Sequence, residues 1–206
     1  DQEYAASLGS TEHHPRGSIA MKWTDETKET TLRDIEWSVG KTGVITPVAI
    51  FDPIRLGAGS TVTRASMHNL SVMESIPSEE EDTPSTLQIG SKIQVGLANM
   101  IIPQVYTQTP GQAEAMHPIH VPETCPVCGE KTLQKNRNGV KVLYCPNAGC
   151  PARTRGMLGN AFSRSGLNIK GLGPSQIEDL QQTGLLELYP AEAYTLKKRT
   201  NGTLPA

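Results

Sequence analysis

Alternating apolar and polar residues predict β-strands in the first half of the chain. Over residues 30–39 the two kinds alternate, with Ile35 and Trp37 on the apolar face, which is the period of a half-buried strand. Residues 44–51 are apolar on both faces and predict a more buried strand. Because proline has no amide proton for a β ladder, Pro53 predicts the end of this strand.

Glycine-rich turns at residues 40–43 and 57–59 separate these strands from their neighbours. Three further strands are expected over residues 61–66, 92–95 and 101–106. Five short strands in this length are typical of an OB barrel, a closed Greek-key barrel that often binds nucleic acid on one face. Residues 74–85, rich in acidic residues, serine and proline, predict a loop whose acidic run at 79–82 faces away from any polyanionic partner.

After residue 150 the pattern becomes helical. Residues 154–165 predict one helix, and a Gly-Leu-Gly-Pro sequence begins a second helix in which Ile177 and Leu180 share a face. This order is typical of a helix-hairpin-helix element. In such an element Gly171 and Gly173 would let the backbone approach a nucleic-acid phosphate, which the amides of the second helix then bind. The alternative is a glycine-rich turn between two packed helices.

Composition favours several small modules over one large core. Hydrophobic residues make up 36% of the chain and aromatic residues only 4%. No apolar run approaches the roughly 18 residues of a membrane span, and there is no apolar signal segment. We therefore expect a soluble, monomeric, cytoplasmic protein with no membrane partner.

The net charge of −2 hides a strong asymmetry along the chain. Residues 125–170 hold eight basic residues and one acidic residue, a formal charge of +7, which leaves −9 for the remainder. A compact module with this surplus suits a polyanionic partner. The alternative is a solvated basic face with no ligand.

All four cysteines lie in two close pairs, Cys125 with Cys128 and Cys145 with Cys150. The spacings are C-x2-C and C-x4-C, and the 16 residues between the pairs are enough for a short hairpin that brings them together. Four thiolates delivered in this way predict one tetrahedral, structural Zn²⁺ site.

Three other interpretations of the cysteines remain open, the simplest of which is four unrelated thiols. Two disulfides would suit a small secreted domain, but these cysteines span only residues 125–150 and do not staple the whole chain. Iron in a rubredoxin-like site uses the same ligands, usually on two C-x2-C loops. His117 and His120 lie just upstream, and with four thiolates at hand we expect both in a solvated loop.

Five motifs in this order resemble the NAD-dependent DNA ligases of bacteria. They are VGKTGVITPVAIFDP at 39–53, VTRASMHNL at 62–70, IIPQV at 101–105, CPVCG at 125–129 and NIKGLGPSQIEDL at 168–180. Members of this family seal nicks in duplex DNA during replication and repair in the bacterial nucleoid. The resemblance implies the end of an adenylation domain at 1–29, an OB-fold domain at 30–116, a four-cysteine zinc finger at 117–152 and a partial helix-hairpin-helix region at 153–206.

The resemblance also assigns a role to Lys22. HHPRGSIAMKW at residues 13–23 is similar to the last nucleotidyltransferase motif of the family, in which this lysine lies beside the adenylate phosphate and stabilises charge that develops during adenylyl transfer. The alternative is a strand lysine that points to water. The family's nucleophilic lysine sits in K-x-D-G, which this sequence lacks. We expect the full-length enzyme to use NAD and Mg²⁺, and the chain alone to bind DNA without forming the lysine-adenylate or sealing a nick.

The same family implies contacts with nicked duplex DNA. Lys41 occupies the arginine position of a VGRTG turn, and Arg64 lies in VTRASMHN, so both are candidate phosphate contacts. Many relatives carry two arginines before IPQV that this chain lacks, which weakens phosphate attraction, and Lys92 compensates in part.

The second cysteine pair is also one residue tighter than the C-x5-C of many relatives. The rival interpretation is a free-standing barrel and zinc ribbon that binds nucleic acid without catalysis.

Overall fold

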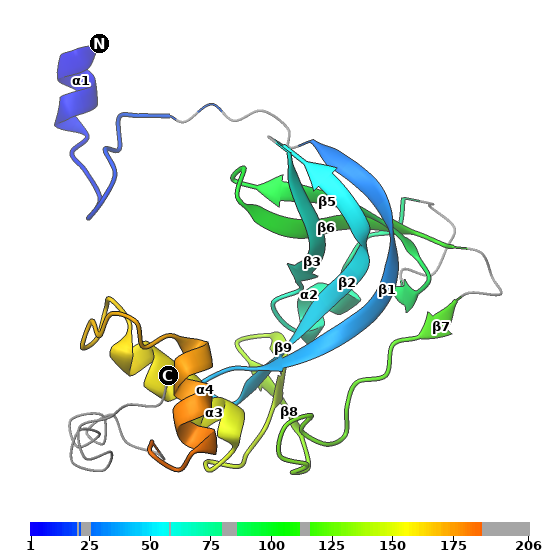
Figure 1. Cartoon of the computed structure of the whole chain (residues 1–206). Coiled ribbons are helices and arrows are strands. Elements are labelled where there is room, and N and C mark those ends of the chain that lie inside the picture. The colour runs from blue at the N-terminus through cyan, green and yellow to red at the C-terminus, as the bar shows by residue number, and fades with distance from the viewer. Residues whose placement is uncertain (20, 22–25, 58, 80–85, 112–115, 187–206) are drawn as a thin grey trace.

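The computed structural model describes residues 1–19, 21, 26–57, 59–79, 86–111 and 116–186 (Figure 1). The helices are α1 (Gln2–Ser7), α2 (Leu70–Glu74), α3 (Pro151–Phe162) and α4 (Pro174–Gln182). The strands are β1 (Thr27–Val39), β2 (Val44–Leu56), β3 (Ser60–Ser66), β4 (Gln88–Ile89), β5 (Lys92–Ala98), β6 (Ile102–Thr109), β7 (His117–Pro118), β8 (Leu133–Arg137) and β9 (Val140–Tyr144). None of the helices in the described ranges is long and apolar enough to cross a membrane.

A five-stranded barrel forms around the long strand β1. The first part of β1 pairs with β5 and the second part with β2, and the register shifts between Leu32 and Asp34 where the strand passes from one neighbour to the other. β3 pairs with β2, β6 pairs with β5, and β3 lies beside β6, which closes the barrel. Leu32, Ile45 and Ile93 are fully buried inside it. The predicted mainly β fold with five strands is confirmed.

Strand β2 runs past the point where its end was predicted. It continues through Pro53 to Leu56, so the prediction of a strand end at Pro53 is wrong. The ladder between β2 and β3 is irregular between Ile50 and Ile54, which places the proline where no ladder amide is required. The long β2 therefore spans the barrel, and its opposite end reaches the cysteine-rich module.

A short helix lies in the segment between the third and fourth barrel strands. In α2 the Asn69 side chain accepts a hydrogen bond from the Val72 amide at 2.9 Å, which caps the helix start. Leu70 and Met73 are buried against the barrel. Five residues are too few for a clear helical period, so the hydrophobic pattern did not predict this helix.

The hairpin of β8 and β9 belongs to the same sheet as the barrel. β9 pairs with the start of β2 through Val44 opposite Tyr144 and Ile45 opposite Leu143, and Leu143 is buried in the barrel core. The sheet order is β6-β5-β1-β2-β9-β8. The hairpin predicted between the cysteine pairs is thus an extension of the barrel wall, as Figure 1 shows where β9 meets the lower end of β2.

Two packed helices follow the hairpin and have a core of their own, formed by Leu158, Phe162, Ile177, Leu180 and Leu186. α3 begins at Pro151, three residues before the predicted start, because proline suits the first position of a helix, where no amide partner is needed. Ile177 and Leu180 share the buried face of α4, as the sequence predicts. At the other end of the chain, α1 lies apart from the barrel (Figure 1).

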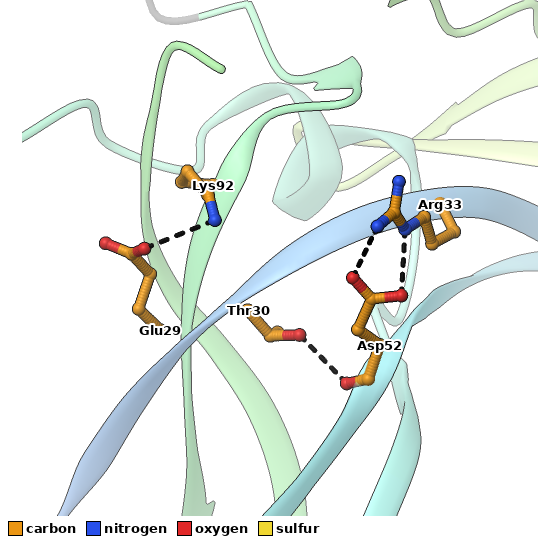
Figure 2. Close-up of polar contacts among 5 residues, drawn as sticks. All are labelled: Glu29, Thr30, Arg33, Asp52 and Lys92. Carbon is orange, nitrogen blue, oxygen red and sulfur yellow. Dashed lines mark hydrogen bonds and ion pairs between the residues drawn. The ribbon is translucent and has the colours of Figure 1, made fainter. Parts of the chain in front are cut away.

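Figure 2 shows a group of charged side chains on β1, β2 and β5 outside the barrel. Arg33 donates two hydrogen bonds to the Asp52 carboxylate, at 2.8 Å from Nε and 2.6 Å from Nη2. The buried Thr30 hydroxyl donates to the main-chain oxygen of Asp52 at 2.8 Å, and Lys92 lies 3.4 Å from Glu29. The hydrogen bonds from Arg33 lower the pKa of Asp52 below its ordinary value.

Replacing Arg33 with glutamine is expected to raise the pKa of Asp52 towards its ordinary value. A carboxyl group with a lowered pKa stabilises the folded state at pH values above its pKa in the unfolded chain. This stabilisation is lost as the pH falls through its pKa in the folded state. Carboxyl ¹³C NMR titration measures the shift directly. Arg64→Gln is the matched control because Arg64 pairs with Glu36 instead. An unchanged Asp52 pKa in Arg33→Gln would rule out this explanation of the shift.

Candidate functional site

The four cysteines converge on one point between the barrel and the helical pair. Cys125 and Cys128 lie on a loop before β8, Cys145 directly follows β9, and Cys150 precedes α3. Their Sγ atoms all lie within 4.8 Å of one another, with 3.9 Å between Cys125 and Cys150 and 3.6 Å between Cys128 and Cys145. A tetrahedron with Zn–S bonds of about 2.3 Å has sulfur atoms about 3.8 Å apart, so the geometry fits Zn²⁺.

Local hydrogen bonds shape the loop that carries the first cysteine pair. The Cys125 amide donates to the Glu130 carbonyl at 2.7 Å, and the Gly129 amide donates to the Cys125 carbonyl at 2.9 Å. Gly129 has a φ of 73°, which glycine adopts without strain. This tight turn is the reason a C-x2-C spacing directs both thiols to the same side.

The chemistry of the four sulfur atoms favours a closed, structural centre. Cys125, Cys145 and Cys150 are buried, and all four cysteines are free of disulfide bonds. Burial raises the pKa of Cys145 to about 12 and also raises the pKa of Cys150, whereas the Glu130 amide lowers the pKa of Cys128 to about 7. A bound divalent cation would replace these thiol protons. Among the described residues, the metal-ligand cluster contains no histidine, so His117 and His120 are not part of it. Both are exposed, but the prediction of a loop is wrong for His117, which begins β7.

The barrel turn between β1 and β2 packs directly on the cysteine centre. The Cys145 amide donates to the Gly43 carbonyl at 2.8 Å. Gly43 has a φ of 86°, and a Cβ there would lie 2.7 Å from the Cys145 carbonyl oxygen and 2.8 Å from the Tyr144 ring. Only glycine fits this position.

Lys41 in the same turn contacts helix α3. A Cβ at Gly156 would lie 2.9 Å from the Cβ of Lys41, so the helix and the turn approach as closely as glycine permits. The Lys41 Nζ donates to Asn160 Oδ1 at 2.6 Å. This candidate DNA contact therefore also holds the helical pair against the barrel.

The other two barrel cations selected from the sequence have acidic partners. Arg64 lies 2.6 Å from Glu36, and Lys92 lies 3.4 Å from Glu29. All four side chains are largely exposed, so these pairs form and break at low cost in free energy. Lys22 lies outside the described residues.

The two predicted glycines of the helical pair have different conformations. Gly171 has a φ of 81° and no atom within 4 Å of where a Cβ would stand. Gly173 is the N-cap of α4, and its amide donates to the Gln176 side chain at 3.2 Å. Gly171 thus turns the chain, and Gly173 begins the second helix.

Sequence reasoning missed an exposed apolar tip on the hairpin of β5 and β6. Met100, Ile101 and Ile102 are 84%, 78% and 54% exposed. Asn99 and Met100 both have positive φ, which keeps the hairpin turn tight. The available signal was three large apolar residues directly after a turn asparagine, whereas the pattern over 101–106 predicts a strand that begins at Ile101.

Two families of domains match the chain in sequence. Residues 29–116 match the NAD-dependent DNA ligase OB-fold domain, and residues 124–152 match the NAD-dependent DNA ligase C4 zinc finger domain. The first match covers the barrel, and the second covers the cysteine centre with its hairpin.

Curated relatives agree with both matches. The DNA ligase of Ruminiclostridium cellulolyticum is 45% identical over 204 residues, which are 99% of this chain and 29% of the relative. The DNA ligase of Lachnoclostridium phytofermentans is 44% identical over 187 residues, 91% of this chain and 26% of the relative. The chain thus spans between a quarter and a third of the length of these relatives. It belongs to the NAD-dependent DNA ligase family and carries that family's OB-fold and C4 zinc finger domains.

Proposed function

We propose that this chain is the part of an NAD-dependent DNA ligase that holds nicked duplex DNA. The observation that carries the proposal is the continuous sheet that joins an OB barrel to a basic, cysteine-centred module. Such a surface binds the phosphate backbone, which a ligase requires because it must act on nicks in any sequence.

One structural Zn²⁺ would be held by Cys125, Cys128, Cys145 and Cys150. The ion would supply no chemistry to the reaction, because four sulfur ligands leave it no open position. Its task would be to fold the loops that join barrel, hairpin and helices.

The exposed apolar tip at Met100, Ile101 and Ile102 suits the minor groove. Proteins that bind there often insert apolar side chains between base steps, which needs no particular sequence. Lys41 beside α3, and the amides at the start of α4, would contact phosphates at the end of the barrel where the helical pair packs. Arg64 and Lys92 would exchange their acidic partners for phosphates on binding.

The sealing chemistry would rest on groups that this chain does not contain. It has no K-x-D-G sequence for the nucleophilic lysine. In the whole enzyme, NAD would donate the adenylate with Mg²⁺ present, and Lys22 would stabilise the charge that develops on its phosphate. The enzyme would act as a monomer on DNA of the bacterial nucleoid.

Equilibrium binding of the zinc-loaded chain to a nicked duplex at several salt concentrations tests the proposal. We expect the logarithm of the association constant to fall linearly with the logarithm of salt concentration, by about 0.9 for each phosphate contact. Duplexes of unrelated sequence should bind with the same affinity. An affinity that is insensitive to salt, or no binding at low salt, would refute a backbone clamp.

A further inference from the structure

Most cations of the barrel strands have acidic partners, unlike two cations of the β8–β9 hairpin. Within the described ranges, four barrel cations lie within 4.0 Å of a carboxylate, namely Lys28, Arg33, Arg64 and Lys92, whereas Arg55 of β2 has no such partner. On the hairpin, Lys141 pairs with Glu74 of α2 at 2.7 Å. Lys135 and Arg137 of β8 form no ion pair with any carboxylate that the structure describes. Their positive charge is therefore not compensated locally.

The register of the hairpin places these two cations on its outer face. Lys135 is opposite Val142, Arg137 is opposite Val140, and the alternate residues of β9 include Leu143, which is buried in the barrel core. Because successive side chains in a strand point to opposite faces, Lys135 and Arg137 point away from the core. Lys141 lies on the other face, where its amide donates to Ser71 of α2 at 2.8 Å.

The outer face is hollowed where the hairpin meets the barrel. The hollow has a volume of about 540 Å³ and is lined by the turn, β2 and the hairpin, through Thr42, Val44, Lys135, Arg137, Val142 and Tyr144. The lining, which also includes Asn136, thus combines two cations and polar groups with apolar and aromatic side chains.

The ring of Tyr144 lies beneath Lys135 and beside Arg153. The Lys135 Nζ lies 4.0 Å from the centre of the Tyr144 ring, and the Arg153 guanidinium carbon lies 5.7 Å from it. A cation over an aromatic face is held without an acidic partner, so it keeps its charge for a ligand. Arg137, two residues from Lys135 in the same strand, has its Cα about 7 Å away, which lets the two side chains reach neighbouring phosphates of one DNA strand.

We propose that the outer face of the β8–β9 hairpin, centred on Lys135 and Arg137, binds backbone phosphates of duplex DNA as a contact surface separate from the barrel. This inference rests on the proposed function, because it assigns a role in DNA binding to the zinc module itself. The zinc module then has two tasks: it connects the barrel to the helices, and it widens the footprint of the protein on DNA.

Neutralising both cations tests this surface. In the full 206-residue chain, K135Q/R137Q should bind a nicked duplex at least about tenfold more weakly at 0.1 M salt, and its salt slope should be smaller by about two. The control K28Q/K141Q removes the same charge from two cations outside this face, one on β1 and one on the opposite face of the hairpin. It should keep the wild-type affinity and slope to within about twofold. K135R/R137K retains both charges and should bind like the wild type.

Each outcome separates this inference from the proposed function. If the wild-type chain binds DNA and K135Q/R137Q, with full zinc content and an unchanged melting temperature, binds equally tightly, the hairpin surface is refuted and the DNA-holding role stands. If K28Q/K141Q loses as much affinity as K135Q/R137Q, net charge alone explains the effect and the surface is again refuted. If the wild-type chain itself does not bind, the proposed function fails first.

Discussion

Replacing Cys125 with serine is expected to abolish metal binding, unfold the β8–β9 hairpin and weaken DNA binding. Cys125 is 2% exposed and its Sγ belongs to the four-sulfur cluster. A serine hydroxyl does not ionise in the accessible pH range, so the substitution removes one of the four ligands that a tetrahedral Zn²⁺ needs.

The expected effect is large because metal binding and folding are coupled. Structural Zn²⁺ contributes about 10–16 kcal/mol in zinc-finger peptides, which matches or exceeds the about 5–15 kcal/mol net stability of a whole domain. Every residue of β8 is exposed, so this strand has no core contacts of its own, and without the ion the hairpin depends on the pairing of β9 with β2 and the burial of Leu143. Loss of β9 would also uncover Leu143 and the start of β2.

Zinc content by mass spectrometry, circular dichroism and DNA titration measure this result. Val127→Ser is the matched control, because Val127 lies in the same loop, is 45% exposed and is no ligand. It should keep one zinc per chain and wild-type binding. A Cys125→Ser chain that still holds one equivalent of zinc with unchanged DNA affinity would contradict the structural role of the ion.

Gly43→Ala is expected to lower the free energy of unfolding by about 2–5 kcal/mol and to weaken zinc binding. The left-handed φ of 86° contributes about 1–2 kcal/mol of strain for any residue with a Cβ. The added methyl would lie 2.7 Å from the Cys145 carbonyl oxygen, so the turn or the metal ligand must shift, at a further cost of about 1–3 kcal/mol.

The control variant Gly139→Ala separates the cost of the left-handed backbone from the cost of the steric contact with Cys145. Gly139 also has a left-handed φ, of 83°, but a Cβ there would meet nothing within 4 Å. The free energy of unfolding of this variant should therefore fall only by the cost of the backbone strain, and its zinc affinity should be unchanged. Denaturant unfolding and competition with a chelator measure both quantities. Equal losses in the two alanine variants would show that the contact between the barrel turn and Cys145 contributes nothing.

Local patterns in the sequence predicted most of the elements. All five barrel strands follow from alternating or continuous apolar segments between turn residues, and α4 follows from its glycine-proline start. The exceptions have physical causes. α2 is too short for a helical period, and Pro53 falls at an irregularity in the ladder that sequence alone does not reveal.

The candidate metal centre could be predicted from the sequence equally well, since all four ligands follow from two short spacings. The candidate DNA contacts could not be selected reliably from the sequence. Lys41, Arg64 and Lys92 were selected by resemblance, but Arg64 and Lys92 have carboxylate partners and Lys41 bonds Asn160, 119 residues away in the chain. Lys135 and Arg137 were only two among eight basic residues until the register placed them on one outer face.

The strands of the barrel, the cysteine centre and the family could all be read from the amino-acid sequence, because each depends on residues close together in the chain. Three features required the folded chain: the pairing of β9 with β2, the packing of the turn at Gly43 on Cys145, and the acidic partners of the barrel cations. They join segments up to about 100 residues apart, and their pairing is set by shared burial and close backbone approach, which no local pattern encodes.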